Sequence, residues 1–505
     1  MTLLGSFVST VVPWLVVGFY GLALVWMLIF CGMQARLAWF YARDKKNSPQ
    51  TPPSSPKSWP RVTIQLPIYN ELYVVERLLE AVTQIDYPHP KLEIQVLDDS
   101  TDETATVLQQ QIAHYQKMGH DIHYLHRSDR VDFKAGALRA GLAHATGELI
   151  AIFDADFLPP KDWLQKTVPF FEEAQLGLLQ TRWGHLNADY SLLTRVQAFA
   201  LDIHFTIEQK GRNLRHHFIN FNGTAGIWRK ACIEEAGNWQ GDTLTEDLDL
   251  SYRAQLKGWR FRYLESVVAP AEIPMTVEAI RSQQFRWNKG GAENFQKLIA
   301  ALWRNPKTSI RTKIYGSFHL LSSSMFVPVF LISLLSLPML YLKNNHPAWA
   351  SWYPLTAFFW LGALLLYVSY WQFYKHDPTQ KQSSRGRYTQ TFFWFYTVVM
   401  GFAAHNTRAV WQGHRRIKTP FVRTVKFNKT ISKKGGVVNK YLGRQTFTAL
   451  WLEVIMALYM LAGVYTCLTL GKGIDYGVLP FYLLVFMGYA TVLYYGWSSS
   501  KRQKP

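Results

Sequence analysis

The fold of this chain is decided by the stretch Leu149-Ile150-Ala151-Ile152-Phe153-Asp154-Ala155-Asp156. Five consecutive apolar residues are typical of a strand that is buried on both faces of a sheet. Two carboxylates follow directly, and the ligands of a parallel sheet bind beyond the carboxyl ends of its strands. The stretch therefore predicts a buried strand with a polar site at its end.

Three strand-like segments precede this stretch and alternate with helical patterns. The predicted strands are Val62–Leu66, Leu92–Leu97, Ile122–Leu125 and Leu149–Phe153, and the predicted helices are Leu72–Ile85, Asp102–Met118 and Lys134–His144. This β-α-β-α order predicts an α/β domain with a largely parallel sheet and helices on both of its faces. Polar residues also follow the first two strands, namely Asn70 and Glu71, and Asp98 and Asp99.

Asp154 and Asp156 form a pattern that suits a divalent metal ion. Mg²⁺ and Mn²⁺ prefer oxygen ligands and usually bind through one or two carboxylates together with phosphate oxygens. Such an ion offsets the charge that develops on a departing diphosphate. The alternative is a solvated turn. The fully apolar strand before the pair strengthens the metal interpretation, but the residues alone leave both open.

Two further motifs suit a nucleotide, and each also has a purely structural interpretation. In Asp98-Asp99-Ser100-Thr101-Asp102, a carboxylate can accept hydrogen bonds from a nucleobase or a ribose, or the segment can simply cap a helix. In Lys134-Ala135-Gly136, the lysine can meet a phosphate or a base while the glycine permits close backbone approach, or the segment can be an ordinary helix start. The residues alone leave these alternatives open.

Two later motifs suit the acceptor end of a transfer reaction. Thr245-Glu246-Asp247 opens a helical pattern, in which Asp247 can act as a general base if burial raises its pKa, or the motif can cap the helix. Gln283-x-x-Arg286-Trp287 lies on an amphipathic helix, where Arg286 can pair with a diphosphate and Trp287 can stack on a sugar. Its alternative is an interfacial helix with a tryptophan at headgroup level.

Long apolar runs flank this central region and predict an integral multi-pass membrane protein. Thr10–Gly32 carries no charge and exceeds the roughly 20 residues that a spanning helix needs. It is too long for a signal peptide, and neither a positive segment before it nor a small-residue cleavage site after it is evident. The other predicted spans form two hairpins: Gly316–Leu342 with Ala350–Phe373, and Thr446–Leu470 with Tyr476–Trp497.

The formal net charge of +19 is distributed as in a membrane protein. Much of the excess lies beside apolar runs, as in Arg415-Arg416-Ile417-Lys418 and Lys433-Lys434, which follows the positive-inside bias and argues against a nucleic-acid partner. Both basic C-terminal segments fall inside if Thr391–Trp411 lies in the interface instead of spanning. The bias therefore favours five spans, an outer N-terminus, an inner C-terminus and a cytosolic central domain.

In their order and spacing, the motifs resemble those of family 2 glycosyltransferases, and most of all the processive cellulose synthase-like branch. The set is Pro67-Ile68-Tyr69-Asn70-Glu71, Asp98-Asp99-Ser100, Lys134-Ala135-Gly136, Asp154-x-Asp156, Thr245-Glu246-Asp247 and Gln283-x-x-Arg286-Trp287. Val96–Asp102, Phe153–Phe157 and Phe221–Arg229 look like plant mannan and glucan synthase-like proteins, of the glucomannan and xyloglucan-backbone kind. The ordered set spans about residues 60–440 and is specific, although each motif alone is weak.

The resemblance implies a GT-A-like, Rossmann-like domain that binds a nucleotide sugar, and it assigns a role to each residue. Nucleotide binding is implied for Asn70, Glu71, Asp98, Asp99, Lys134 and Asp154. Binding of Mg²⁺ or Mn²⁺ is implied for Asp154 and Asp156. Deprotonation of the acceptor hydroxyl is implied for Asp247, with Glu246 beside it. Contact with the leaving diphosphate and the terminal sugar is implied for Thr245, Gln283, Arg286 and Trp287.

A later segment, Phe421-Val422-Arg423-Thr424-Val425-Lys426, resembles the F-x-V-T-x-K gating loop of bacterial cellulose synthase, with Arg423 in place of its valine. The resemblance implies that Phe421, Thr424 and Lys426 cover the nucleotide at the cytosolic mouth, which places residues 412–445 in the cytosol. Bacterial cellulose synthase also carries a C-terminal cyclic-di-GMP-binding domain. The last hairpin here ends just before Pro505, so we expect no regulation by that route within this chain.

These expectations divide the chain into seven parts. They are an N-terminal transmembrane helix with its cytosolic exit (1–45), a proline-rich linker (46–60), a GT-A-like glycosyltransferase domain (61–275), interfacial helices with the QxxRW motif (276–312), a transmembrane hairpin (313–374), an interfacial helix with the gating loop (375–445) and a C-terminal transmembrane hairpin (446–505).

The expected activity is an inverting, metal-dependent hexosyl transfer that polymerises a β-linked glucan or mannan and moves it across the inner or plasma membrane. The expected donor is UDP-glucose, with GDP-mannose as the alternative, and export or accessory proteins are further expected partners. A second hypothesis is transfer of one sugar to a membrane lipid. A transporter or scaffold without enzymatic activity would leave the ordered carboxylates unexplained.

Overall fold

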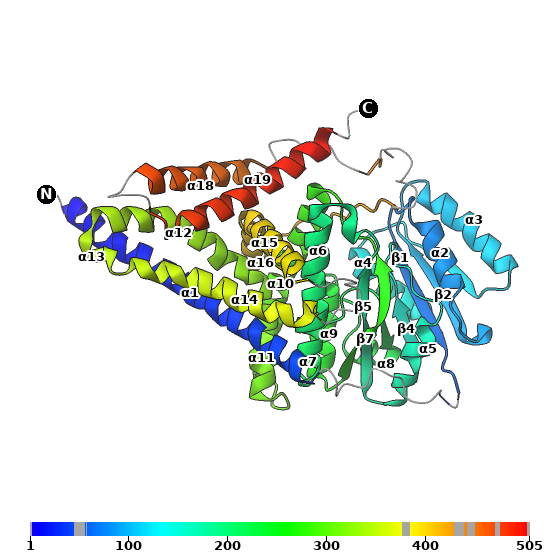
Figure 1. The fold of residues 1–505 in the computed structure, drawn as a ribbon. Coiled ribbons are helices and arrows are strands. Elements are labelled where there is room, and N and C mark those ends of the chain that lie inside the picture. Colours follow the sequence, from blue (N-terminus) through cyan, green and yellow to red (C-terminus); the bar gives the residue numbers. More distant parts are fainter. Residues whose placement is uncertain are drawn as a thin grey trace.

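The fold combines an α/β domain with a bundle of long helices, as the computed structural model shows (Figure 1). The structure describes residues 3–44, 56, 58–375, 384–428, 439–441, 450–469 and 475–501. Most of the predicted linker 46–60 and part of the predicted segment 412–445 lie outside these residues. The sheet lies at one end of the molecule, and the helices α1, α12, α14, α18 and α19 extend away from it.

The sheet of the α/β domain has seven strands in the order β3-β2-β1-β4-β6-β5-β7. The strands are β1 (Val62–Ile68), β2 (Leu92–Asp98), β3 (Ile122–His126), β4 (Leu149–Ile152), β5 (Leu176–His185), β6 (Gly226–Arg229) and β7 (Arg260–Ala271). Strand β6 alone runs against its neighbours β4 and β5. The predicted fold class and the first four predicted strands are confirmed, whereas the last three strands were not predicted.

Helices cover both faces of this sheet, as the pattern predicts. On one face lie α2 (Val75–Thr83) and α3 (Thr104–Lys117), whose buried side chains share a core with Val62, Ile64 and Leu66 of β1. On the other face lies α4 (Phe133–His144), which packs with β4. A Cβ atom at Gly141 would lie 2.7 Å from the amide nitrogen of Gln65, so this glycine allows α4 to approach the sheet.

Five of the described helices are long and apolar enough to cross a membrane. They are α1 (Leu3–Asp44), α12 (Phe326–Asn345), α14 (Phe358–Tyr374), α18 (Trp451–Thr469) and α19 (Leu479–Lys501). These helices match the five predicted runs, although the second one begins later than predicted. The predicted start at Gly316 falls within a separate helix, α11 (Ile310–Leu320), and the membrane-length segment begins at Ser322.

A layer of further helices lies between the sheet and the bundle (Figure 1). It consists of α6 (Leu192–Ile203), α9 (Glu246–Leu256), α10 (Val277–Arg304), α15 (Arg385–Gly401) and α16 (Ala403–His414). The run predicted as an interfacial helix, 391–411, is divided between α15 and α16 near Phe402, and neither piece is among the five membrane-length helices. A buried ion pair between Arg281 of α10 and Glu453 joins this layer to α18.

Helices α15 and α19 cross at two glycines. A Cβ atom at Gly401 would lie 2.3 Å from the carbonyl oxygen of Gly488, and one at Gly488 would lie 2.4 Å from the carbonyl oxygen of Thr397. Both positions therefore require glycine, because a Cβ atom would clash with the backbone of the facing helix. Small residues permit such close backbone approach between packed helices.

We predict that Gly401→Ala lowers the stability of the protein by about 1–3 kcal/mol, because its methyl group forces the two backbones apart. Thermal unfolding in detergent measures the effect. Gly21→Ala on α1 is the matched control, since a Cβ there has no atom within 4 Å. Equal melting temperatures for the two variants would contradict the inferred crossing.

Candidate active site

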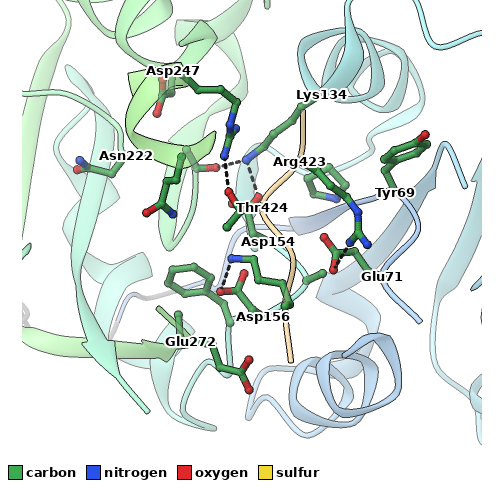
Figure 2. A pocket seen from close by; sticks show the side chains of 18 of the residues that line it. Tyr69, Glu71, Lys134, Asp154, Asp156, Asn222, Asp247, Glu272, Arg423 and Thr424 are labelled. Atoms are coloured by element: carbon green, nitrogen blue, oxygen red, sulfur yellow. Dashed lines mark hydrogen bonds and ion pairs between the residues drawn. The ribbon is translucent and has the colours of Figure 1, made fainter. Parts of the chain in front are cut away.

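A pocket opens at the carboxyl ends of β1, β2 and β4 and is closed by α9, α10 and the segment 421–426 (Figure 2). Most of the predicted site residues line it, and these are Glu71, Asp99, Lys134, Asp154, Asp156, Thr245, Glu246, Asp247, Gln283, Arg286, Trp287, Phe421, Thr424 and Lys426. The fold thus brings motifs that are far apart in the sequence into one site.

Two predicted site residues, Asn70 and Asp98, are absent from the pocket lining. The amide oxygen of Asn70 accepts a hydrogen bond of 2.8 Å from the Thr101 backbone, and its own backbone is left-handed (φ 53°). Asp98 is fully buried and accepts hydrogen bonds from the Tyr124 hydroxyl (2.7 Å) and the Ser100 backbone (2.9 Å). Their contacts shape the loops after β1 and β2.

Asp99 lines the pocket, and Arg127 holds its carboxylate in place. The Arg127 guanidinium donates two hydrogen bonds to it, of 2.8 Å and 2.6 Å. This bidentate pairing fixes the orientation of the carboxylate. Asp99 therefore presents a rigid acceptor to a ligand.

The centre of the pocket is an ion pair between Lys134 and Asp154. The Lys134 ammonium lies 2.5 Å from the Asp154 carboxylate and also donates a 2.8 Å hydrogen bond to the Gly223 carbonyl. Burial alone would lower the pKa of Lys134, but the charges of Asp154 and then Glu246 outweigh it and raise that pKa. The lysine therefore stays charged, as phosphate binding requires.

Asp156 has one filled and one unfilled carboxylate oxygen. Its Oδ2 atom accepts a 2.7 Å hydrogen bond from Lys426, whereas its Oδ1 atom is buried with no hydrogen-bond partner among the described residues. Those residues contain no cluster of three or more metal-ligating side chains. One or two carboxylates completed by phosphate oxygens fit Mg²⁺ or Mn²⁺, and Lys426 provides the positive charge in this structure.

Asp247 lies on the first turn of α9 at the opposite end of the pocket from Glu71. Burial and then the charge of Glu246 raise the pKa of Asp247 to about 7, and burial also raises the pKa of Glu246. A carboxylate of this kind can take a proton near neutral pH. A Cβ atom at Gly223, whose φ is +81°, would lie 3.3 Å from the Asp247 carboxylate, so this glycine keeps the approach to Asp247 open.

The neighbouring helix α10 holds both Asp247's helix and the loop segment in place. Thr245, which precedes Glu246, accepts a 2.9 Å hydrogen bond from Asn294, and Gly290 allows the two helices to meet there. Arg286 donates a 2.9 Å hydrogen bond to the Thr424 hydroxyl, and its guanidinium lies 4.7 Å from the centre of the Phe421 ring. The segment 421–426 therefore crosses the pocket in contact with α10 (Figure 2).

The sequence did not single out several residues of the pocket. Arg130 lies with its guanidinium 3.2 Å from the centre of the Tyr69 ring, and Trp183 and Glu272 line the same pocket. Arg423 was noted only as a departure from the gating-loop pattern. No spacing marks these residues, because they come from loops and strand ends that meet only in the folded domain.

A partly buried hydrogen-bonded chain also joins the pocket wall to the membrane-length helix α1. The Gln34 amide of α1 donates to Glu208 (2.6 Å), whose other carboxylate oxygen lies 2.9 Å from His204. The second ring nitrogen of His204 lies 2.8 Å from the amide nitrogen of Asn222, which lines the pocket. His204 and Glu208 belong to a π-helical segment, His204–Gln209, and such segments are frequent at functional sites.

The central part of the chain is similar to known proteins. Residues 60–290 match the family described as "Glycosyltransferase like family 2", in agreement with the resemblance of the motifs in that part of the chain. The probable glucomannan 4-beta-mannosyltransferase 10 of Arabidopsis thaliana is 39% identical over 307 residues, or 59% of this chain and 56% of that protein.

Two further relatives give the same result. The glucomannan 4-beta-mannosyltransferases 2 of Arabidopsis thaliana and 1 of Oryza sativa subsp. japonica are each 42% identical, over 51% and 52% of this chain and 49% and 51% of those proteins. The chain spans about half the length of the curated relatives it matches. Among solved structures, a mannosyltransferase of Pyrobaculum calidifontis in complex with GDP-Man and Mn²⁺ is 20% identical and covers 69% of this chain and 98% of its own, with a TM-score of 0.48.

We predict that Asp247→Asn lowers the rate of sugar transfer by about 10²- to 10⁴-fold and leaves nucleotide affinity within about threefold, because the amide cannot take a proton. Transfer assays and nucleotide titrations on the same preparation measure the two effects. Asp242→Asn, at an exposed position before α9, is the matched control. Normal turnover by Asp247→Asn would remove Asp247 from the role of base.

The raised pKa of Asp247 predicts an acidic limb in the pH profile. The base must be deprotonated, so the acceptor kcat/KM at saturating donor should fall about tenfold per pH unit below about pH 7 and level off above it. Initial rates across this range test the expectation. A profile that is flat through pH 7, with the fold intact by circular dichroism, would contradict it.

Proposed function

We propose that this chain, whose residues 60–290 form a family 2 glycosyltransferase domain, polymerises a β-linked mannan-type glycan at a membrane. One observation carries the proposal. The pocket joins a buried base, Asp247, to the cationic side chains Lys134 and Arg286, which can hold a diphosphate between them. The match of about 40% to glucomannan 4-beta-mannosyltransferases supports the choice of product.

The proposed donor is a mannose nucleotide, GDP-mannose, in place of the UDP-glucose expected from the sequence. The relatives are named as mannosyltransferases, which favours mannose over glucose. No comparison supports UDP-glucose as the donor. The proposed donor is therefore the alternative that the resemblance had left open.

In the proposed reaction, Asp247 takes the proton of the acceptor hydroxyl while that oxygen attacks the anomeric carbon from the face opposite the diphosphate. The bond between the anomeric carbon and the diphosphate oxygen breaks, and Lys134 and Arg286 face the charge that remains on the leaving group. A single in-line displacement inverts the anomeric carbon, so an α-linked donor gives a β-linkage. Mg²⁺ or Mn²⁺ held by Asp154 and Asp156 would supply additional neutralisation of the diphosphate charge.

The proposed location is the inner or plasma membrane, with the catalytic domain in the cytosol and the product crossing between the helices. The five apolar helices and the basic segments beside them support this orientation. Transfer of a single sugar to a membrane lipid is the second candidate, because α10, which closes the pocket, is joined to the membrane-length helix α18 by the ion pair of Arg281 with Glu453. The names of the relatives favour the polymer.

The product distinguishes the two candidates. The purified protein in lipid should convert labelled GDP-mannose, with Mg²⁺ or Mn²⁺, into long chains that β-mannanase degrades, and it should use UDP-glucose less well. Asp247→Asn serves as the negative control, because this variant retains the pocket but lacks the general base. A product of one sugar on a lipid would overturn the polymerase proposal and leave the glycosyltransferase domain unaffected.

A labelling experiment tests the proposed orientation. A cysteine at Lys418, which is exposed after α16, should react with a membrane-impermeant maleimide only from the cytosolic side. A cysteine at Asn345, exposed at the end of α12, should react only from the other side and serves as the matched control. Labelling of both positions from the same side would contradict the arrangement of spans.

A further inference from the structure

The pocket is elongated, and its two ends differ in chemistry. Figure 2 shows Asp247 at one end, Asp154 and Asp156 in the middle, and Glu71 and Arg423 at the other end. A nucleotide sugar whose sugar lies at Asp247 and whose diphosphate lies at the two aspartates therefore places its nucleoside at Glu71 and Arg423. This placement rests on the proposed function.

Glu71 provides a carboxylate that is almost closed off from solvent. It follows β1, and its side chain is 13% exposed. Burial raises the pKa of Glu71 to about 7, although the charges of Arg423 and Lys426 act in the opposite direction. A buried carboxylate of this kind is costly unless a partner supplies hydrogen-bond donors.

Arg423 provides a guanidinium whose terminal donors are unfilled. Its side chain is also 13% exposed, and its Nη1 atom lies 2.9 Å from the Glu71 carboxylate. Neither Nη1 nor Nη2 makes a hydrogen bond of good geometry to the described residues. The guanidinium lies 4.1 Å from the centre of the Tyr441 ring, and stacking of this kind fixes the plane of an arginine while leaving its edge available.

The two groups together match the edge of one nucleobase. Guanine offers two adjacent acceptors, O6 and N7, to the fork of an arginine, and two adjacent donors, N1–H and the 2-amino group, to a carboxylate. Uracil offers a single N–H between two carbonyl oxygens, so it can fill only one position on each group. Arg423 and Glu71 can therefore form more hydrogen bonds with guanine than with uracil.

We propose that Arg423 and Glu71 read guanine and thereby select a GDP-sugar as the donor. On binding, guanine inserts between the two side chains. Its hydrogen bonds then replace the ion pair that Arg423 and Glu71 form with each other. The residue at this position of the resembled gating-loop pattern is valine, which has no donor to offer. The segment 421–426, which covers the pocket, then contributes to base selection through Arg423.

Binding of free nucleotides to the full-length protein in detergent tests the proposal without requiring a polymer product. We expect the unmodified protein, with Mn²⁺ present, to bind GDP at least about tenfold more tightly than UDP. Arg423→Val should lose about tenfold or more in GDP affinity and about threefold or less in UDP affinity, because guanine gives up two contacts and uracil one. Arg423→Lys should give the same loss, because an ammonium keeps the charge without the fork.

The carboxylate is tested by removing one donor from the base. IDP lacks the 2-amino group, so the unmodified protein should bind IDP about fivefold or more weakly than GDP, and Glu71→Gln should shrink that difference. Arg415→Val, at an exposed position outside the pocket, is the matched control and should behave as the unmodified protein. Thermal melting of every variant confirms that each is folded.

Two results would overturn the inference. Equal losses of GDP and UDP affinity in Arg423→Val would assign Arg423 to the ribose or the diphosphate. An unchanged GDP preference in that variant would remove Arg423 from base selection, and transfer from GDP-mannose by the same variant would leave the proposed function standing. Tighter binding of UDP than GDP by the unmodified protein would overturn the inference and the proposed donor together, but not the glycosyltransferase domain.

Discussion

The structure of the site depends on the compensation of charge in a buried pocket. Seven carboxylates line it, namely Glu71, Asp99, Asp154, Asp156, Glu246, Asp247 and Glu272, against the five cations Arg130, Lys134, Arg286, Arg423 and Lys426. Ions withdrawn from water must be paired or change their protonation state. The pocket shows both responses, since Lys134 pairs with Asp154 whereas the pKa of Asp247 rises to about 7.

Two of these five cations come from the segment that follows the helical layer, so the pocket is completed from outside the α/β domain. The segment is fixed by α10 and α16. Lys289 of α10 donates a 2.6 Å hydrogen bond to Thr419, and a Cβ atom at Gly413 of α16 would lie 2.6 Å from the Lys289 carbonyl oxygen. The close contact of these two helices therefore determines where Arg423 and Lys426 enter the pocket. The charge balance of the site consequently depends on the packing of the helical layer.

The sequence predicted the elements whose side chains follow a simple period. Strands β1 to β4 read as short apolar runs, and the helices between them carry an apolar face, so local patterning was sufficient. Strands β5, β6 and β7 were not predicted. Gly226–Arg229 has only two apolar residues between a glycine and an arginine, and Arg260–Ala271 mixes charged and apolar residues, so neither forms an apolar run. Asn70 and Asp98 were predicted as site residues but do not line the pocket. A polar residue at a strand end can stabilise the loop instead of binding the ligand.

The sequence by itself determined the order of the chemical motifs, which lie largely within the match to glycosyltransferase family 2 over residues 60–290, and the five membrane-length helices. Each of these is recorded in local spacing or in the length of an apolar run. Only the tertiary structure decided which of the motif residues face one another. It placed Arg423 beside Glu71, left one oxygen of Asp156 without a hydrogen bond to the described residues, and connected Asn222 through His204 to the membrane helix α1. The contacts of Arg423 and of Asn222 join residues that are distant in the chain, and their physical reason is that buried polar groups find partners wherever the fold brings them together. The Asp156 oxygen is the exception, and it faces the site.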